Sequence, residues 1–178
     1  MAFETEIFTN MLESWIDYPD KDSNSIVVYF TGCAFNCIGC HNAELKGDKL
    51  PEDLVVKVDA YELYKKLIKL SERLNGTRKV VFQGGDPLYI KNIDTVRDFL
   101  KINKIFDVCI YTGCDIETVK SLNIHGFKFI KCGQFVLEKY QQADKTEERM
   151  VLASTNQEIY DAEYNKLSVN GILTFGGN

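Results

Sequence analysis

The sequence contains little that would direct the chain into a membrane or out of the cell. No apolar run approaches the length that a membrane span needs. The N-terminus carries Glu4 and Glu6 where a secretory signal peptide has a basic and then an apolar region. We therefore expect a cytoplasmic protein without a membrane partner, in which the six cysteines act as thiols rather than as disulfides.

Positive charge and proline are also scarce. The 21 Lys and Arg residues are outnumbered by 26 Asp and Glu residues, which gives a net charge of −5. Because an acidic surface is repelled by a phosphate backbone, no nucleic-acid partner is expected. With only three prolines, no repeat and no low-complexity linker, the chain is expected to form one domain over residues 1–178. The polar stretch 135–178 is expected to be a C-terminal extension of it.

Short apolar runs that are typical of strands alternate with segments of helical periodicity. Strands are predicted at 26–31, 79–83, 107–111 and 126–130, and helices at 58–74, 92–104 and 115–122. This alternation indicates parallel βα units, and four such units are too few to close an eight-fold barrel. The predicted fold class is therefore α/β, an open partial (β/α) barrel with parallel strands.

A turn that contains glycine or cysteine follows each predicted strand. These turns are the cysteine-rich segment after residue 31, Gly84-Gly85, Thr112-Gly113 and Cys132-Gly133. Because the carboxyl ends of parallel strands share one edge, where ligands bind, we expect the four turns to form one site.

Three cysteines lie within eight residues of one another directly after the first predicted strand. Cys33, Cys37 and Cys40 have the spacing Cys-x3-Cys-x2-Cys. A cubane iron–sulfur cluster with a full thiolate shell needs four ligands, so three would leave one position open for substrate chemistry. A closed zinc site also needs four, and the adjacent His41 is poorly placed to be the fourth. The spacing therefore favours a [4Fe–4S] cluster over structural zinc.

The turn Gly84-Gly85-Asp86-Pro87 has two interpretations. Two glycines at a strand end allow a ligand to approach the backbone closely, and Asp86 would add a carboxylate suited to a zwitterionic amino acid. A side chain at Gly85 would then block the ligand. Alternatively, this is a tight turn in which Asp86 caps a helix and Pro87 takes its first position.

Together these motifs resemble a known superfamily. The Cys-x3-Cys-x2-Cys segment and the Gly-Gly-Asp-Pro turn resemble those of radical S-adenosylmethionine enzymes. The segment Gly39-Cys40-His41-Asn42 resembles the activating enzymes of glycyl-radical enzymes. Three further segments are similar to the activase of anaerobic (class III) ribonucleotide reductase, namely Tyr111-Thr112-Gly113, Gly133-Gln134-Phe135 and Ser154-Thr155-Asn156-Gln157. Two positions depart from that family, which often has Asp at position 132 and Arg at position 158, where this chain has Cys132 and Glu158.

The resemblance implies an oxidoreductase with a [4Fe–4S] cluster and S-adenosyl-L-methionine as cofactors. Cys33, Cys37 and Cys40 would hold three irons, and the cofactor's amino and carboxylate groups would bind the fourth. The implied cofactor-binding residues are His41 and Asn42 at the adenine, Gly84, Gly85, Asp86 and Pro87 at the amino group, and Tyr111 and Thr112 at the nucleoside or sulfonium.

The implied reaction is the reductive cleavage of S-adenosylmethionine. The resulting 5′-deoxyadenosyl radical would abstract hydrogen from a glycine of the anaerobic ribonucleoside-triphosphate reductase. The implied partners are the large glycyl-radical reductase subunit and a one-electron donor such as flavodoxin or ferredoxin. One alternative is a small-molecule radical S-adenosylmethionine enzyme such as a 7-carboxy-7-deazaguanine synthase-like protein, and another is a non-catalytic iron–sulfur or zinc module.

The other three cysteines are not expected to bind a second cluster. Cys109 lies inside a predicted strand and is expected to be a buried apolar residue. Cys114 and Cys132 follow strand ends and could lie near the site, but their spacing is too wide for a ligand set of their own.

Overall fold

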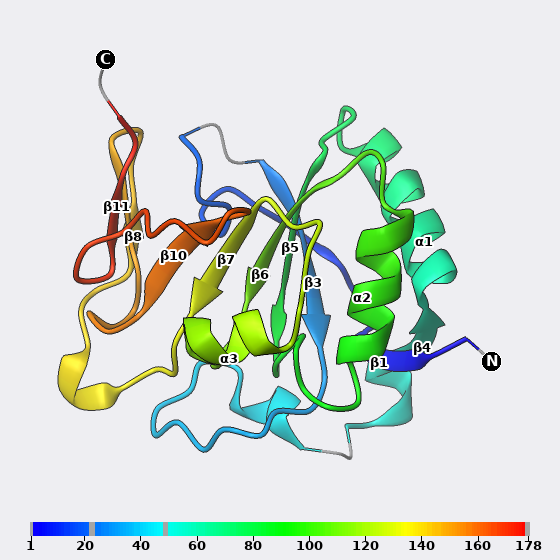
Figure 1. The fold of residues 1–178 in the computed structure, drawn as a ribbon. Coiled ribbons are helices and arrows are strands. Elements are labelled where there is room, and N and C mark those ends of the chain that lie inside the picture. Colours follow the sequence, from blue (N-terminus) through cyan, green and yellow to red (C-terminus); the bar gives the residue numbers. More distant parts are fainter. Residues whose placement is uncertain (1, 22–23, 48–49, 177–178) are drawn as a thin grey trace.

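The computed structural model describes residues 2–21, 24–47 and 50–176. Its centre is a mixed sheet whose strands lie side by side in a linear order (Figure 1). The order is β10 (Glu158–Asp161), β7 (Phe129–Cys132), β6 (Asp107–Tyr111), β5 (Lys79–Gly84), β3 (Ser25–Phe30), β1 (Glu4–Phe8) and β4 (Val55–Asp59). The four central strands β3, β5, β6 and β7 pair in parallel. The predicted α/β class, with parallel strands in an open arrangement, is confirmed.

The edges of the sheet are antiparallel, which the sequence did not predict. On one side β1 pairs antiparallel with both β3 and β4, and on the other β10 pairs antiparallel with β7. A short strand, β2 (Leu12–Ser14), also pairs antiparallel with β3. These added strands fall outside the alternation of apolar runs and helical segments from which the fold was predicted, and their pairing depends on contacts with the neighbouring strands.

Two elements begin two or three residues later than predicted. The helix predicted from 58 begins at Ala60 as α1 (Ala60–Arg73), because Val58 and Asp59 still belong to β4. Asp59 then caps the helix: its side chain accepts a hydrogen bond from the Glu62 amide, and Glu62 bonds back to the Asp59 amide. The strand predicted at 126–130 begins at Phe129, because Gly126 adopts a φ of +89° in the preceding turn.

The helices cover one face of the sheet. They are α1, α2 (Ile93–Ile102) and α3 (Ile116–Ser121), and α1 and α2 lie next to each other in Figure 1. Alternate strand residues such as Val28, Phe82 and Ile110 pack against them in the main core. Because neighbouring residues on a strand point to opposite faces, Val27, Val81 and Cys109 pack on the other face, around the buried Tyr18. The expected burial of Cys109 is confirmed.

The C-terminal stretch contributes to both the central sheet and a second, smaller one. β10 extends the central sheet, whereas β8 (Asp144–Lys145), β9 (Arg149–Val151) and β11 (Ile172–Thr174) pair with one another. Met150, Leu152 and Leu173 pack this small sheet toward Tyr111 and Phe129 of the central strands. The stretch therefore forms a second layer over the carboxyl ends of the central strands and over the sheet face opposite the helices.

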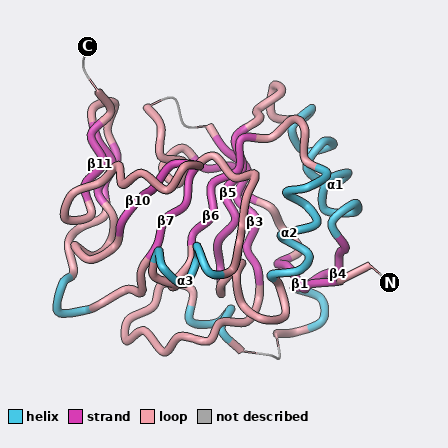
Figure 2. Tube along the Cα trace, in the orientation of Figure 1, coloured by secondary structure: helices cyan, strands magenta, loops and turns pink. Residues whose placement is uncertain are grey.

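The remaining regular elements are short. They are the single-turn 3-10 helices η1 (Ala43–Lys46), η2 (Glu52–Leu54) and η3 (Leu137–Lys139). The segment between β3 and η1, which carries the three motif cysteines, is loop (Figure 2). Among the described residues, no helix has the length and apolar character needed to cross a bilayer.

Candidate functional site

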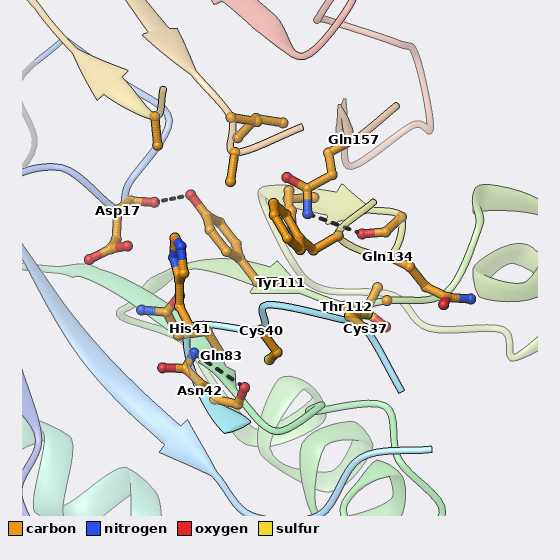
Figure 3. A pocket seen from close by; sticks show the side chains of 18 of the residues that line it. Asp17, Cys37, Cys40, His41, Asn42, Gln83, Tyr111, Thr112, Gln134 and Gln157 are labelled. Carbon is orange, nitrogen blue, oxygen red and sulfur yellow. Dashed lines mark hydrogen bonds between the residues drawn. The ribbon is translucent and has the colours of Figure 1, made fainter. Parts of the chain in front are cut away.

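The turns that follow β3, β5, β6 and β7 line one cavity of about 380 Å³. The predicted site residues along it are Cys33, Cys37, Cys40, His41, Asn42, Gly84, Gly85, Tyr111 and Thr112. Figure 3 labels six of them, namely Cys37, Cys40, His41, Asn42, Tyr111 and Thr112. Gly113 and Gly133, from the other predicted turns, also line it. The expectation that the four turns converge on one edge is therefore confirmed. Asp86 and Pro87 are not among the lining residues, and neither are Cys114 and Cys132.

The Cys loop, residues 33–40, is held mainly at its base. The Gly32 amide donates a hydrogen bond to the Leu45 carbonyl (2.8 Å), and Lys46 Nζ donates one to the Cys37 carbonyl (3.1 Å). Within the loop, Gly39 adopts a φ of +74°, which a residue with a side chain rarely takes. The conformation of the loop thus depends on a glycine turn and on few hydrogen bonds.

The three motif cysteines face the cavity together and are each partly buried. Burial, and to a smaller extent the nearby groups Asp86, Cys37 and Cys40, raise the pKa of the Cys33 thiol. Within the described part of the chain, no three His, Cys, Asp or Glu side chains are close enough to hold a single metal ion. A zinc ion would need its thiolates about 2.3 Å away on a shared centre, whereas a cubane cluster takes one thiolate at each iron. The three thiols share one cavity, and each could therefore bind one iron of a cubane cluster.

The Gly84-Gly85 turn is bonded directly to the base of the Cys loop. The Gly85 amide donates to the Phe30 carbonyl and the Asp86 amide to the Gly32 carbonyl, both at 2.8 Å. A Cβ atom on Gly85 would lie 2.2 Å from the Gly32 carbonyl oxygen. The expectation that a side chain at Gly85 would simply occupy ligand space is therefore wrong, because it would first displace the Cys loop.

Asn42 joins the same two segments from the other side. Its Nδ2 donates a hydrogen bond of 3.4 Å to the Gly84 carbonyl, which Figure 3 marks with a dashed line. His41 precedes it, with an exposed ring whose centroid lies 6.0 Å from that of Phe135. Both residues lie at the cavity, as the sequence predicts, and neither is buried.

Asp86 lies behind the cavity wall rather than in it. Its carboxylate is 1% exposed and accepts hydrogen bonds from the Leu88 amide, the Gly113 amide and the Thr112 hydroxyl, at 2.8–3.0 Å. Burial raises its pKa, although these donors oppose the rise. The carboxylate thus ties the turn after β5 to the turn after β6. The alternative interpretation of Asp86 and Pro87 as the start of a helix is wrong, since α2 begins at Ile93.

Asn92 is a site-supporting residue that the sequence did not reveal. It is 1% exposed, and its Nδ2 donates to the carbonyls of Thr31 and Asp86, both at 2.8 Å. Its Oδ1 accepts a hydrogen bond from the Thr5 hydroxyl of β1. Two of its three partners lie 61 and 87 residues away, so no local motif marks it. The only sign in the sequence was its position at the start of a predicted helix.

The far side of the cavity carries Tyr111 and residues that the motifs did not identify. The Tyr111 hydroxyl donates to the Asp17 carbonyl (2.5 Å), and burial raises its pKa well above its ordinary value. Lys131 also lines the cavity, and its ammonium lies 5.2 Å from the centre of the Tyr111 ring. Gln157 Nε2 donates to the Gly133 carbonyl, as Figure 3 shows. Residues 143–145 and 150–153 close this side, which we call the C-terminal wall.

Residues 24–160 match the family model of the 4Fe–4S single cluster domain. The chain belongs to this family. The match extends from just before β3 to β10 and includes all three motif cysteines, and it confirms the predicted [4Fe–4S] cluster. The assignment of the ligands to Cys33, Cys37 and Cys40 stays a prediction.

Comparison with other proteins adds little to the family assignment. No curated protein matches the chain. Among solved structures, QueE from Escherichia coli is similar over 62% of this chain, with 18% sequence identity and a TM-score of 0.39. The chain spans about half of that protein, 52% of its length, and a similarity of this size carries no argument about function.

Proposed function

We propose that this protein is a radical S-adenosylmethionine enzyme that activates the anaerobic ribonucleoside-triphosphate reductase. The observation that carries the proposal is the single cavity that unites the three motif cysteines with the backbone of Gly84 and Gly85. Three thiolates leave one cluster position open, and the glycine backbone beside them suits an amino-acid group that would bind there. The resemblance of the sequence motifs to those of the glycyl-radical activases supports the reductase as the substrate.

The roles of the residues follow from their positions around the cavity. Cys33, Cys37 and Cys40 would hold three irons. Gly84 and Gly85 would allow the methionyl part of the cofactor to approach the backbone closely, and Asp86 holds their turn in register with that of Thr112 and Gly113. When bound, the cluster and S-adenosylmethionine supply a one-electron reductive cleavage and a carbon radical that can remove a hydrogen atom.

Two side chains on each side of the cavity would complete the cofactor site. His41 and Asn42 are proposed to contact the adenine, and Tyr111 and Thr112 the nucleoside or sulfonium region. Burial keeps the Tyr111 hydroxyl protonated, and its bond to the Asp17 carbonyl fixes the ring. Such a radical reaction requires that water be excluded, and the walls of the cavity are proposed to contribute to this. A flavodoxin or ferredoxin is the proposed electron donor.

The size of the cavity supports a protein substrate. A volume of about 380 Å³ lies toward the lower end of the ~300–1,000 Å³ that is usual for ligand pockets. We propose that the cluster and S-adenosylmethionine occupy this space and that the substrate reaches it from outside. A glycine on a loop of a large partner needs the least space of any residue, because it brings no side chain into the cavity.

Exposed apolar side chains beside the Cys loop also support a protein partner. Ile38 is 73% exposed on the loop itself, and Leu137 and Tyr140 are 49% and 56% exposed on the neighbouring segment. Leu137 lies next to the position of Gly39, and Tyr140 packs edge-on against Phe135. Exposed apolar groups gathered at one place are typical of surfaces that bind another protein.

The experiment is a glycyl-radical assay under anaerobic conditions. The reconstituted and reduced protein is mixed with S-adenosylmethionine and the anaerobic reductase, and an electron paramagnetic resonance spectrum is recorded. We expect a glycyl-radical doublet on the reductase, and none with the Cys37→Ala variant or without S-adenosylmethionine. Efficient conversion of a small molecule, with no radical on the reductase, would refute the activase role.

The second candidate is a small-molecule enzyme of the 7-carboxy-7-deazaguanine synthase type. It is favoured by charged side chains that line the cavity, among them Asp17, Lys131 and Asp144, since a small polar substrate needs such partners. The C-terminal wall, which partly encloses the cavity, fits it as well. Product analysis after incubation with candidate pterin-like substrates separates it from the activase.

A further inference from the structure

Lys131 extends from β7 toward the cavity. Along this strand Ile130 and Cys132 pack into the main core beneath the helices, whereas Phe129 packs on the opposite face, around Tyr18. Because side chains alternate along a strand, Lys131 shares the face of Phe129, and it lines the cavity together with the three motif cysteines. A lysine at this position is unusual, since Lys131 is partly buried and removing a charge from water is costly unless something compensates it.

No carboxylate compensates it directly. Within the described residues, the Lys131 ammonium has no hydrogen bond or ion pair, and its contact is with the face of the Tyr111 ring, 5.2 Å from the centroid. The Asp86 carboxylate attracts it from a greater distance but is already bonded to Thr112, Gly113 and Leu88. Burial lowers the pKa of Lys131, while Asp86, Cys132, Cys37 and Cys109 raise it.

Two other lysines of the cavity differ in this respect. Lys46 Nζ donates to the Cys37 carbonyl at 3.1 Å, and Lys145 Nζ donates to the Tyr18 carbonyl at 2.7 Å. Each thus has a fixed structural bond. Lys131 is held only by an aromatic face, so its charge is available to a negative charge that arises inside the cavity.

We propose that Lys131 raises the reduction potential of the [4Fe–4S] cluster by placing its ammonium in the cavity that the Cys loop also lines. A cluster that accepts one electron from its donor, with no proton, gains one unit of negative charge. A cation in the same low-dielectric cavity stabilises this reduced state more than the oxidised one, and net charge near a cluster is a recognised determinant of its potential. The inference rests on the proposed position of the cluster at Cys33, Cys37 and Cys40, but not on cleavage of S-adenosylmethionine.

The test is a redox titration of the reconstituted protein, followed by electron paramagnetic resonance, without S-adenosylmethionine. Lys131→Gln and Lys131→Met remove the charge, Lys131→Arg keeps it, and Lys128→Gln removes a charge outside the cavity, where Lys128 is exposed and paired with Asp107. We expect a more negative midpoint potential in both neutral variants. The Arg and Lys128 variants should have the parental potential.

Three outcomes would overturn the inference. One is a parental potential in the neutral variants at full iron content. Another is loss of the cluster from both neutral variants, which would assign Lys131 a structural role. The third is an unchanged potential with weakened binding of S-adenosylmethionine in calorimetry, which would assign Lys131 to the carboxylate of that cofactor. Failure of the proposed cluster position is recognised separately, by a Cys37→Ala variant that retains the cluster.

Discussion

The cavity has two walls that are built in different ways. The core wall, made of the turns after β3, β5, β6 and β7, is joined by hydrogen bonds among buried groups, with Asp86 and Asn92 at the junctions. The C-terminal wall is attached by apolar packing of Met150, Leu152 and Leu173, and by the bond from Lys145 to the Tyr18 carbonyl. The two walls therefore differ in how they are held, by a network of buried hydrogen bonds in the core wall and mainly by apolar packing in the C-terminal wall.

The largest expected effect lies in the core wall. Replacing Cys33, Cys37 or Cys40 with Ala should abolish the cluster, because a [4Fe–4S] cluster held by three protein ligands has none to spare. Iron content and the visible absorbance spectrum after anaerobic reconstitution measure this. The matched control is Cys109→Ala, which removes a thiol from the buried core and should keep full iron content. Uptake of one tightly bound zinc per chain, without iron, would contradict the prediction.

Gly85→Ala should disturb both the fold and the cluster. The added Cβ meets the Gly32 carbonyl oxygen at 2.2 Å, so the base of the Cys loop must move. Overpacking of this kind costs about 1–3 kcal/mol in the free energy of unfolding, and we expect iron content to fall with it. Urea denaturation and iron analysis are the measurements. Gly176→Ala is the control, since nothing lies within 4 Å of its Cβ position. Full iron content in Gly85→Ala would show that the Cys loop does not depend on this contact.

Asp86→Asn tests the link between the turns after β5 and β6. An Asn amide would direct N–H groups at the Gly113 amide or the Thr112 hydroxyl, where the carboxylate now accepts hydrogen bonds. Leaving a buried donor unsatisfied costs about 1–3 kcal/mol, and we expect the midpoint of urea unfolding to fall accordingly. Asp94→Asn, at an exposed ion pair with Arg97, should change stability by less than about 1 kcal/mol. Equal effects of the two substitutions would argue against a special role for Asp86.

The smallest effect is expected in the C-terminal wall. Lys145→Met removes the hydrogen bond to the Tyr18 carbonyl and should cost about 0.5–1.5 kcal/mol in urea unfolding. Iron content should be unchanged, because this wall carries none of the motif cysteines. Lys101→Met, at an exposed pair with Asp98, provides the control for loss of a surface charge. Loss of the cluster from Lys145→Met would remove the distinction between the two walls.

The sequence predicts the strands and motifs of the core wall far better than the buried side chains that hold its turns together. The strands at 79–83 and 107–111 are visible as apolar runs, and the cysteine spacing is a local pattern. Asp86 could be singled out, but its partners at Thr112 and Gly113 are 26 and 27 residues away, so its burial was not predictable. The position of Lys131 was not predictable for the same reason, since only the pairing of β7 with β6 brings it over Tyr111.

The C-terminal wall could not be predicted for a different reason. Its strands are two or three residues long and carry charged residues such as Asp144, Lys145 and Arg149. A segment of this kind has no clear hydrophobic periodicity, and its pairing is decided by the apolar contacts of Met150 and Leu152 with the central strands.

The central claim is that the cavity holds a cluster at Cys33, Cys37 and Cys40 that cleaves S-adenosylmethionine. The most direct measurement is the amount of 5′-deoxyadenosine formed when the reconstituted protein is reduced anaerobically with a chemical one-electron donor and S-adenosylmethionine. We predict that 5′-deoxyadenosine and methionine form in equal amounts with the parental protein and with Cys109→Ala, and that neither forms with Cys37→Ala. A reduced protein with full iron content that forms no 5′-deoxyadenosine would contradict the account.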